Sequence, residues 1–428
     1  MSAINRIILV GNGFDLSHKL STKYEDFINW YWDKCLYELR RCRNTSYSDQ
    51  LCTFVINENS NTWFGVLWNL ISSLNPPSGR DFFEFIKNET EKFSIHYSPF
   101  MKRICQSIES KGWVDIENEY YMALNEEYFE TPEKINKEFE IIKSNLIEYL
   151  SYIQKEGITE SIIKPKLKNQ ILAPIKINDI AISARHHLIN FIQARSTLDE
   201  KHFIDEFALS INDVLFSDKN DSSTTEFIKY CINKKNEDET ASNIIIENAI
   251  DNNMVPDEML YPNRLMLLNF NYTSTADLYI PQVQNYKNKF IINHIHGNLN
   301  APDGIIFGYG DELDDRYNKL VQLNNNEFLC NVKSIKYLEA ENYRKMLSFI
   351  DSAPYQIYIM GHSCGNSDRT LLNTLFEHKN CISIKPFYYV KDDGSDNYLE
   401  IIQNISRNFT DMKLMRDRVV NKTYCEEL

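Results

Sequence analysis

The feature that most constrains the fold lies at residues 6–16, where a run of apolar residues leads directly into a glycine turn. Ile7 to Val10 are followed by Gly11-Asn12-Gly13, and apolar and aromatic side chains recur at helical spacing from Tyr24 onward. This pattern predicts a buried strand, a tight turn and a helix. Glycines in such a turn allow backbone N–H groups to approach a phosphate closely. The third glycine of the dinucleotide spacing is absent, because Leu16 stands there, so an ordinary strand-to-helix turn is an equally good interpretation.

Composition and charge exclude several classes of protein. The 428 residues are 43% hydrophobic and 13% aromatic, which suffices for two or three domain-sized units with a real core. The formal net charge of -14 provides no long-range attraction to nucleic acid or to an anionic membrane, so we expect neither partner. There is no apolar run of 18 residues and no leader-like N-terminus, and we expect a cytoplasmic protein. The nine cysteines are irregularly spaced without a Cys-x-x-Cys pair, which predicts free thiols and no structural zinc site.

The two ends of the chain have α/β character, and the part between them has helical character. Apolar runs predict strands at 265–270, 290–295, 305–307, 356–360 and 382–390, and helical periodicity predicts helices at 334–350, 367–378 and 398–409. Strands that alternate with helices at this length form a parallel sheet with crossover helices. We therefore predict an α/β fold in which residues 1–44 and 256–428 form a discontinuous Rossmann-like domain. Residues 45–255 form a large α-helical insertion, with aromatic-rich, acidic segments at 63–71, 81–93 and 134–154.

Polar loops follow four of the predicted strands. A doubly wound sheet places its ligand-binding crevice at the carboxyl ends of its strands, so these loops should meet at one edge. Glycine, amide, hydroxyl and imidazole groups on four converging loops are more specific evidence for a ligand site than any one motif. The loops are Gly11 to Asp15, Asn271 to Thr273, His296 to Asn298, and Gly361 to Asp368.

The same loops carry a family resemblance. The segments Val10 to Leu16, Asn269 to Thr273, Ile295 to Leu299 and Met360 to Asp368 resemble motifs of the bacteriophage abortive infection protein AbiH family. Their order and separation are also similar to those of the sirtuin-like NAD-cleaving effectors of bacterial antiphage systems. The resemblance implies an antiphage protein with a Rossmann-like NAD-binding domain that removes nicotinamide from NAD.

The resemblance also implies roles for single residues. It places Asn271 at the nicotinamide ribose and makes His296 the catalytic base. The glycine turn would lie against the pyrophosphate, and Gly361 and Ser363 would hold the adenosine side. The residues predicted to bind the nucleotide are Gly11, Asn12, Gly13, Phe14, Asp15, Gly297, Gly361, His362, Ser363 and Asp368.

The residue types suit this chemistry. Cleavage of the nicotinamide–ribose bond builds positive charge on the sugar and requires a base that activates water. An imidazole, with an ordinary pKa near 6.5, suits this task, and such a base typically contributes ~10²- to 10⁴-fold. Sirtuin deacetylases carry a four-cysteine zinc module, whereas this chain has no Cys-x-x-Cys pair. We therefore expect hydrolysis of NAD to nicotinamide and ADP-ribose without a metal ion.

Structural interpretations of the same residues remain open. His294 is a competing candidate for the base, and Asn271 could be a turn residue. Asp368 could cap the helix that begins there. Asp15 could buttress the first helix or reach ribose hydroxyls, and Glu117 could line the cleft or be solvated.

Two other functions are consistent with the sequence. The first is a nucleotide-binding sensor or interaction module without turnover, in which the loops bind NAD or a related nucleotide. The second is a nuclease effector, which ranks lower because no clustered Asp/Glu/Lys metal site is present and the net charge is acidic. The insertion is our candidate for the part that restrains the enzyme, forms a homo-oligomer, or senses a phage-derived trigger or partner protein.

Overall fold

The computed structural model describes residues 2–42, 46–56, 93–126, 129–196, 222–237, 242–281 and 289–428, together with residues 81 and 87. Its larger sheet has five strands, and every neighbouring pair is parallel. The strands are β1 (Asn5–Val10), β5 (Leu265–Asn269), β6 (Phe290–His294), β7 (Tyr355–Met360) and β8 (Cys381–Phe387). The predicted α/β fold is confirmed, with the first strand in the same sheet as the strands from the C-terminal part of the chain.

The strand order across the sheet is β6-β5-β1-β7-β8. In chain order this is 3-2-1-4-5, which matches the first five strands of the Rossmann arrangement. The chain winds outward from β1 through β5 to β6 and then returns to β7 on the other side of β1. The winding direction therefore reverses between β1 and β7, and open α/β sheets bind their ligands at such a reversal.

Burial of both faces explains why the strands are apolar. Every residue of β1, β5, β7 and β8 is buried, as expected for a parallel sheet with helices on its faces. One apolar cluster joins strand side chains to α8 (Pro165–Leu172). Helix α16 (Asn342–Ser352) contacts β6, and α17 (Arg369–Glu377), α18 (Tyr398–Arg407) and α19 (Met412–Arg418) contact β8.

A charged residue, Arg6, is buried in β1. Its guanidinium donates to the carbonyl oxygens of Ile171 and Ala173 at 3.1 and 2.6 Å, and to the side chain of Gln356. It also lies 4.1 Å from the ring centroid of Tyr358. These partners satisfy the donors of a cation that would otherwise be costly to bury.

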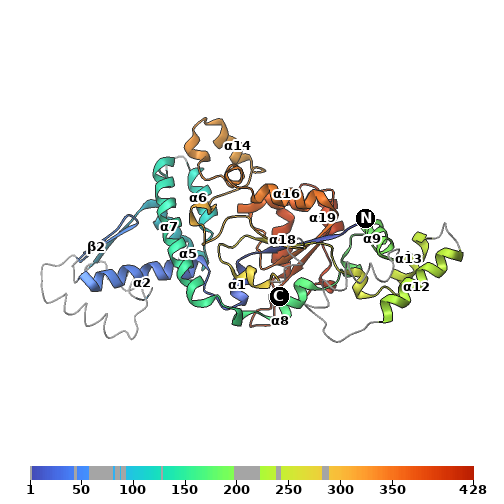
Figure 1. Cartoon of the computed structure of the whole chain (residues 1–428). Coiled ribbons are helices and arrows are strands. Elements are labelled where there is room, and N and C mark those ends of the chain that lie inside the picture. The colour runs from blue at the N-terminus through green and yellow to red at the C-terminus, as the bar shows by residue number, and fades with distance from the viewer. Residues whose placement is uncertain are drawn as a thin grey trace. The chain divides into compact units, whose positions relative to one another are not determined.

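The described chain divides into two compact units. The first contains Met1–Lys19, Ile158–Asn298 and Tyr337–Leu428, and the second contains Leu20–Gly157 and Leu299–Lys336. The five-stranded sheet belongs to the first unit, together with the mutually contacting helices α9 (Arg185–Ser196), α12 (Ser222–Glu237) and α13 (Ser242–Asp251) (Figure 1). The predicted division into residues 1–44 with 256–428 and residues 45–255 stays a prediction.

The second unit combines helices with a small antiparallel sheet that our sequence analysis did not predict. Helix α2 (Tyr24–Cys42) is followed by the three-stranded sheet β2-β3-β4, and α5, α6 and α7 contact one another (Figure 1). The segment 134–154 of the predicted helical insertion is helical as expected and lies within α7, whereas residues 63–71 and most of 81–93 lie outside the described residues. The remaining bounds are β2 (Ser46–Ser48), β3 (Cys52–Ile56), β4 (Phe93–Tyr97), α5 (Pro99–Lys111), α6 (Ile116–Leu124), α7 (Pro132–Gly157) and α14 (Asp315–Gln322).

Two predicted elements are wrong. Residues 305–307 form no strand, because Phe307 stacks on Phe139 of α7 with ring centroids 4.5 Å apart and the segment pairs with no strand. The helix predicted at 334–350 is broken into α15 (Lys333–Lys336), a 3₁₀ turn η11 (Tyr337–Glu339) and α16. At the start of α16, the side chain of Asn342 donates to the carbonyl oxygen of His294 at 2.7 Å.

Candidate functional site

The loops that follow β1 and β7 meet backbone to backbone. Gly361 has φ +78°, and a Cβ added there would lie 2.0 Å from the backbone nitrogen of Phe14. A Cβ added to Gly11 would lie 2.5 Å from the Cα of His362. The Gly13 N–H donates to the carbonyl oxygen of Gly361 at 2.8 Å. The glycines are therefore required for the close approach of these loops, and the contact of Gly11 and Gly13 with a pyrophosphate stays a prediction.

Asn271 ties the loop after β5 to the glycine turn. Its side-chain amide donates to the carbonyl oxygen of Gly11 at 3.0 Å, and its backbone N–H donates to the side chain of Asn269 at 3.0 Å. The second bond is a side-chain to backbone contact typical of Asx turns. The side chain in that turn is the one of Asn269, whereas the half-buried side chain of Asn271 joins two loops.

Asp15 lies in the same corner of the site and is 1% exposed. The hydroxyl of Thr273 donates to its carboxylate at 2.5 Å. Burial raises the pKa of Asp15 to about 6, although the hydrogen bond from Thr273 acts in the opposite direction. The carboxylate therefore titrates near neutral pH, within a network that joins the loops after β1 and β5.

Four side chains from three segments of the chain meet at this edge of the sheet, and we call them the His296 cluster: His296, Tyr337, His362 and Asp368. The Nε2 of His296 lies 3.2 Å from Oδ1 of Asp368 and 3.1 Å from the hydroxyl of Tyr337. The Nε2 of His362 lies 3.6 Å from Oδ2 of the same carboxylate. Asp368 thus bridges two imidazoles, each with one of its oxygens.

The hydrogen bonding of His362 fixes its tautomer. Its Nδ1 accepts the backbone N–H of Cys364 at 3.0 Å, so the neutral ring carries its proton on Nε2, which faces Asp368. Phe270 packs beside both imidazoles, with centroids 5.3 Å from His296 and 4.1 Å from His362. The carboxylate of Asp368 thus lies between two imidazoles, with an aromatic ring packed beside both of them.

The cluster is buried, whereas other predicted site residues on the same loops are more accessible. His296, His362 and Asp368 are 3%, 6% and 8% exposed. The predicted site residues around them are half-buried or exposed, and they are Asn12, Gly13, Asn271, Gly297, Gly361 and Ser363. Buried titratable groups next to more accessible polar loops are typical of a site where chemistry takes place away from bulk water.

The structure shows the contacts of several residues for which the sequence left two interpretations open. Asp368 makes no side-chain bond that caps α17, because its carboxylate is turned toward the imidazoles. His294 faces different partners, with its Nε2 3.2 Å from a carboxylate oxygen of Asp277 and its Nδ1 3.2 Å from the side chain of Asn269. Tyr337 was missed, because the sequence assigned it to a continuous helix.

Two further predicted residues have partners away from the cluster. Phe14 is buried, and its ring contacts His18 and Tyr279 at centroid distances of 5.0 and 5.3 Å. Glu117 belongs to the second unit, where it is buried. Its carboxylate pairs with Lys333 at 3.0 Å and accepts the Gly308 N–H at 3.1 Å, so it is not a solvated acid.

Comparison with known proteins identifies one family. The family model described as bacteriophage abortive infection AbiH matches residues 7–389. This range includes β1 from residue 7 onward, the other four strands of the parallel sheet and the whole His296 cluster. No curated protein and no solved structure matches the chain. None of the helices in the described ranges is both long enough and apolar enough to span a membrane.

Proposed function

The chain belongs to the bacteriophage abortive infection AbiH family, and from this premise we propose that it acts in antiphage defence by hydrolysing NAD to nicotinamide and ADP-ribose. The observation that carries the proposal is the His296 cluster at the carboxyl edge of the parallel sheet. Its members come from the segments after β6 and β7 and from η11. The cluster supplies a base, a carboxylate that orients it, and a hydroxyl.

The position of the cluster supports a nucleotide as the substrate. The reversal of winding between β1 and β7 is where open α/β sheets bind ligands, and Rossmann sheets bind dinucleotides there. The loops after these two strands contain Gly11, Gly13 and Gly361 and lie against each other. In the proposed complex the dinucleotide lies across these loops, with its nicotinamide ribose toward Asn271 and His296. The exposed side chain of Asn12 offers an amide donor for the pyrophosphate.

The chemistry assigns a role to each member of the cluster. His296 takes a proton from water as the water oxygen bonds to the ribose carbon, and nicotinamide leaves with the electrons of the broken bond. The Asp368 carboxylate, 3.2 Å away, stabilises the imidazolium that forms. Tyr337 holds the His296 ring through its hydroxyl at 3.1 Å. His362 holds the second oxygen of Asp368 and thereby fixes the orientation of the carboxylate.

The proposal is tested with the purified chain, NAD and lysate of phage-infected cells. We expect nicotinamide release by the wild type, and losses of roughly 10²- to 10⁴-fold for His296→Ala and Asp368→Asn. His294→Ala is the matched control, because this histidine pairs with Asp277 instead of Asp368. Full activity of His296→Ala, or loss of activity only in His294→Ala, would refute the assignment of the base.

One observation favours a second function, a nucleotide-binding module without turnover. His296 is only 3% exposed, and its Nε2 already meets two partners. An imidazole satisfied in this way can also serve to hold two loops in place. Binding of NAD by wild type and His296→Ala alike, with no nicotinamide released under any activating condition, would favour this second function.

A further inference from the structure

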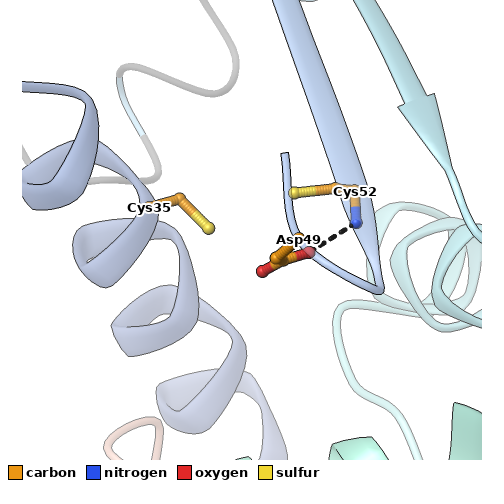
Figure 2. A group of neighbouring side chains, drawn as sticks. All are labelled: Cys35, Asp49 and Cys52. Atoms are coloured by element: carbon orange, nitrogen blue, oxygen red, sulfur yellow. Dashed lines mark hydrogen bonds between the residues drawn. The ribbon is translucent and has the colours of Figure 1, made fainter. Parts of the chain in front are cut away.

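A group of metal-ligand side chains lies in the second unit, where the proposed NAD chemistry assigns no role. Cys35 is on α2, Asp49 follows β2, and Cys52 begins β3. One ligand atom from each side chain, a Sγ or a carboxylate oxygen, lies within 4.8 Å of the other two. Figure 2 shows the two sulfur atoms and the carboxylate pointing toward one shared space between α2 and the strand.

We propose that Cys35, Asp49 and Cys52 bind a zinc ion that ties α2 to the turn between β2 and β3. Two thiolates and one carboxylate form a ligand set that zinc accepts, with the fourth position taken by water. Zn–S bonds of about 2.3 Å in tetrahedral geometry place two sulfurs roughly 3.7 Å apart. The spacing within 4.8 Å therefore requires an adjustment of about 1 Å at most.

The surroundings of Asp49 hold its carboxylate in a fixed orientation. Its Oδ1 accepts the backbone N–H groups of Leu51 and Cys52, both at 2.8 Å. The hydroxyls of Tyr31 and Tyr47 donate to its Oδ2 at 2.9 and 2.8 Å. Metal-binding carboxylates are commonly held by hydrogen bonds of this kind, which orient the ligand before the ion binds. These hydrogen bonds fix both carboxylate oxygens of Asp49, so the side chain does not rotate freely in solvent.

The burial of the two thiols and the exposure of Asp49 are also compatible with a bound cation. Cys35 and Cys52 are both buried, whereas Asp49 is exposed and gives an ion a path of entry. The hydroxyl of Tyr31 lies 3.1 Å from the Cys52 sulfur. Zinc binding replaces two S–H bonds with two Zn–S bonds and releases two protons, with no change in oxidation state.

The choice of zinc follows from the mixed donor set. Two sulfurs exclude magnesium and calcium, which prefer oxygen ligands. The carboxylate disfavours copper(I), which prefers soft donors only. The spacing Cys-x₁₆-Cys lacks the Cys-x-x-Cys signature, and for this reason the sequence analysis predicted no metal site. The site exists only because α2 folds back beside β3.

The test uses the full-length chain, purified without a histidine tag, reduced, and stripped of metal with a chelator. We expect one Co²⁺ per chain, with thiolate-to-cobalt charge-transfer absorption and the visible bands of tetrahedral cobalt. Binding of Zn²⁺ to the metal-free chain should release two protons per ion, and Zn²⁺ should displace bound Co²⁺ without further proton release. Cys52→Ser should lose the charge-transfer absorption, whereas Cys330→Ser, which removes an exposed cysteine outside the cluster, should retain it.

Tyr31→Phe serves as a milder variant that keeps both thiols and removes one donor to Asp49. We expect its zinc affinity to fall roughly ten- to hundred-fold. A cobalt spectrum without charge transfer in the wild type, or one unchanged in Cys52→Ser, would overturn the proposal. Failure of the reduced chain to bind zinc, together with a Cys35–Cys52 disulfide after air oxidation, would also overturn it and identify the pair as a dithiol.

Discussion

Replacement of Asp15 by asparagine tests whether a buried charge lies beside the glycine turn. Asp15 is 1% exposed, and burial raises its pKa from 3.8 to about 6. The folded chain therefore holds this proton more tightly than the unfolded chain does. The stability that Asp15 provides is fully present below pH 3.8 and is lost as the pH rises through 6. The difference of about 2.2 pH units, at about 1.4 kcal/mol for each unit, corresponds to roughly 3 kcal/mol at neutral pH.

Asp15→Asn removes the charge while keeping the shape and an oxygen that can accept the Thr273 hydroxyl. We expect the variant to be more stable than the wild type by roughly 3 kcal/mol at pH 7.5, and by about 1 kcal/mol at pH 4.5. At about 2 °C per kcal/mol, the melting temperature at pH 7.5 should rise by about 6 °C.

Thermal unfolding of both proteins across this pH range measures the difference, with Asp392→Asn as the control for an exposed carboxylate. A variant no more stable than the wild type at pH 7.5 would refute the reasoning. A stability difference that does not change with pH would also refute it, since the argument assigns the whole effect to one titrating group.

Three further substitutions have defined outcomes. Gly361→Ala forces a side chain onto a backbone with φ +78° and a contact of 2.0 Å, so we expect a loss of at least about 2 kcal/mol in denaturant unfolding; an unchanged midpoint would contradict this. Lys333→Met leaves the buried Glu117 carboxylate without its cation and should cost about 3–5 kcal/mol. Adding Glu117→Gln to that variant should recover part of the loss, and no recovery would count against the ion pair. Tyr337→Phe removes the hydroxyl 3.1 Å from His296 and should slow NAD cleavage by up to about tenfold with little change in melting temperature; an unaltered rate would remove Tyr337 from the mechanism.

The sequence predicted the sheet well, because buried parallel strands are continuous apolar runs bounded by turns. The runs at 265–270, 290–295, 356–360 and 382–390 each overlap a strand of the parallel sheet, with starts within one residue of the observed ones. The run at 305–307 has the same local character, but its Phe307 stacks on α7 instead of entering a sheet. A short apolar run predicts that a segment is buried, but its tertiary contacts determine whether the segment is a strand or a loop.

The location of the candidate site could be predicted from the sequence, but the contacts between its side chains could not. Polar loops at strand ends indicated one edge of the sheet, and His296, His362 and Asp368 do meet there. The pairing of Asp368 with two imidazoles could not be predicted, because a capping role fits the same position before a helix. Tyr337 could not be found either, since helical periodicity does not reveal the break between α15 and α16 at which Tyr337 lies beside His296.

The central claim is that His296 is the base for NAD cleavage during phage infection. Its most direct test is the amount of NAD and nicotinamide in infected cells that express the wild type or His296→Ala, measured by mass spectrometry at matched protein levels. The account predicts that NAD falls and an equal amount of nicotinamide appears in cells with the wild type, and that neither change occurs with the variant. Unchanged NAD in both, with phage resistance retained, would contradict it.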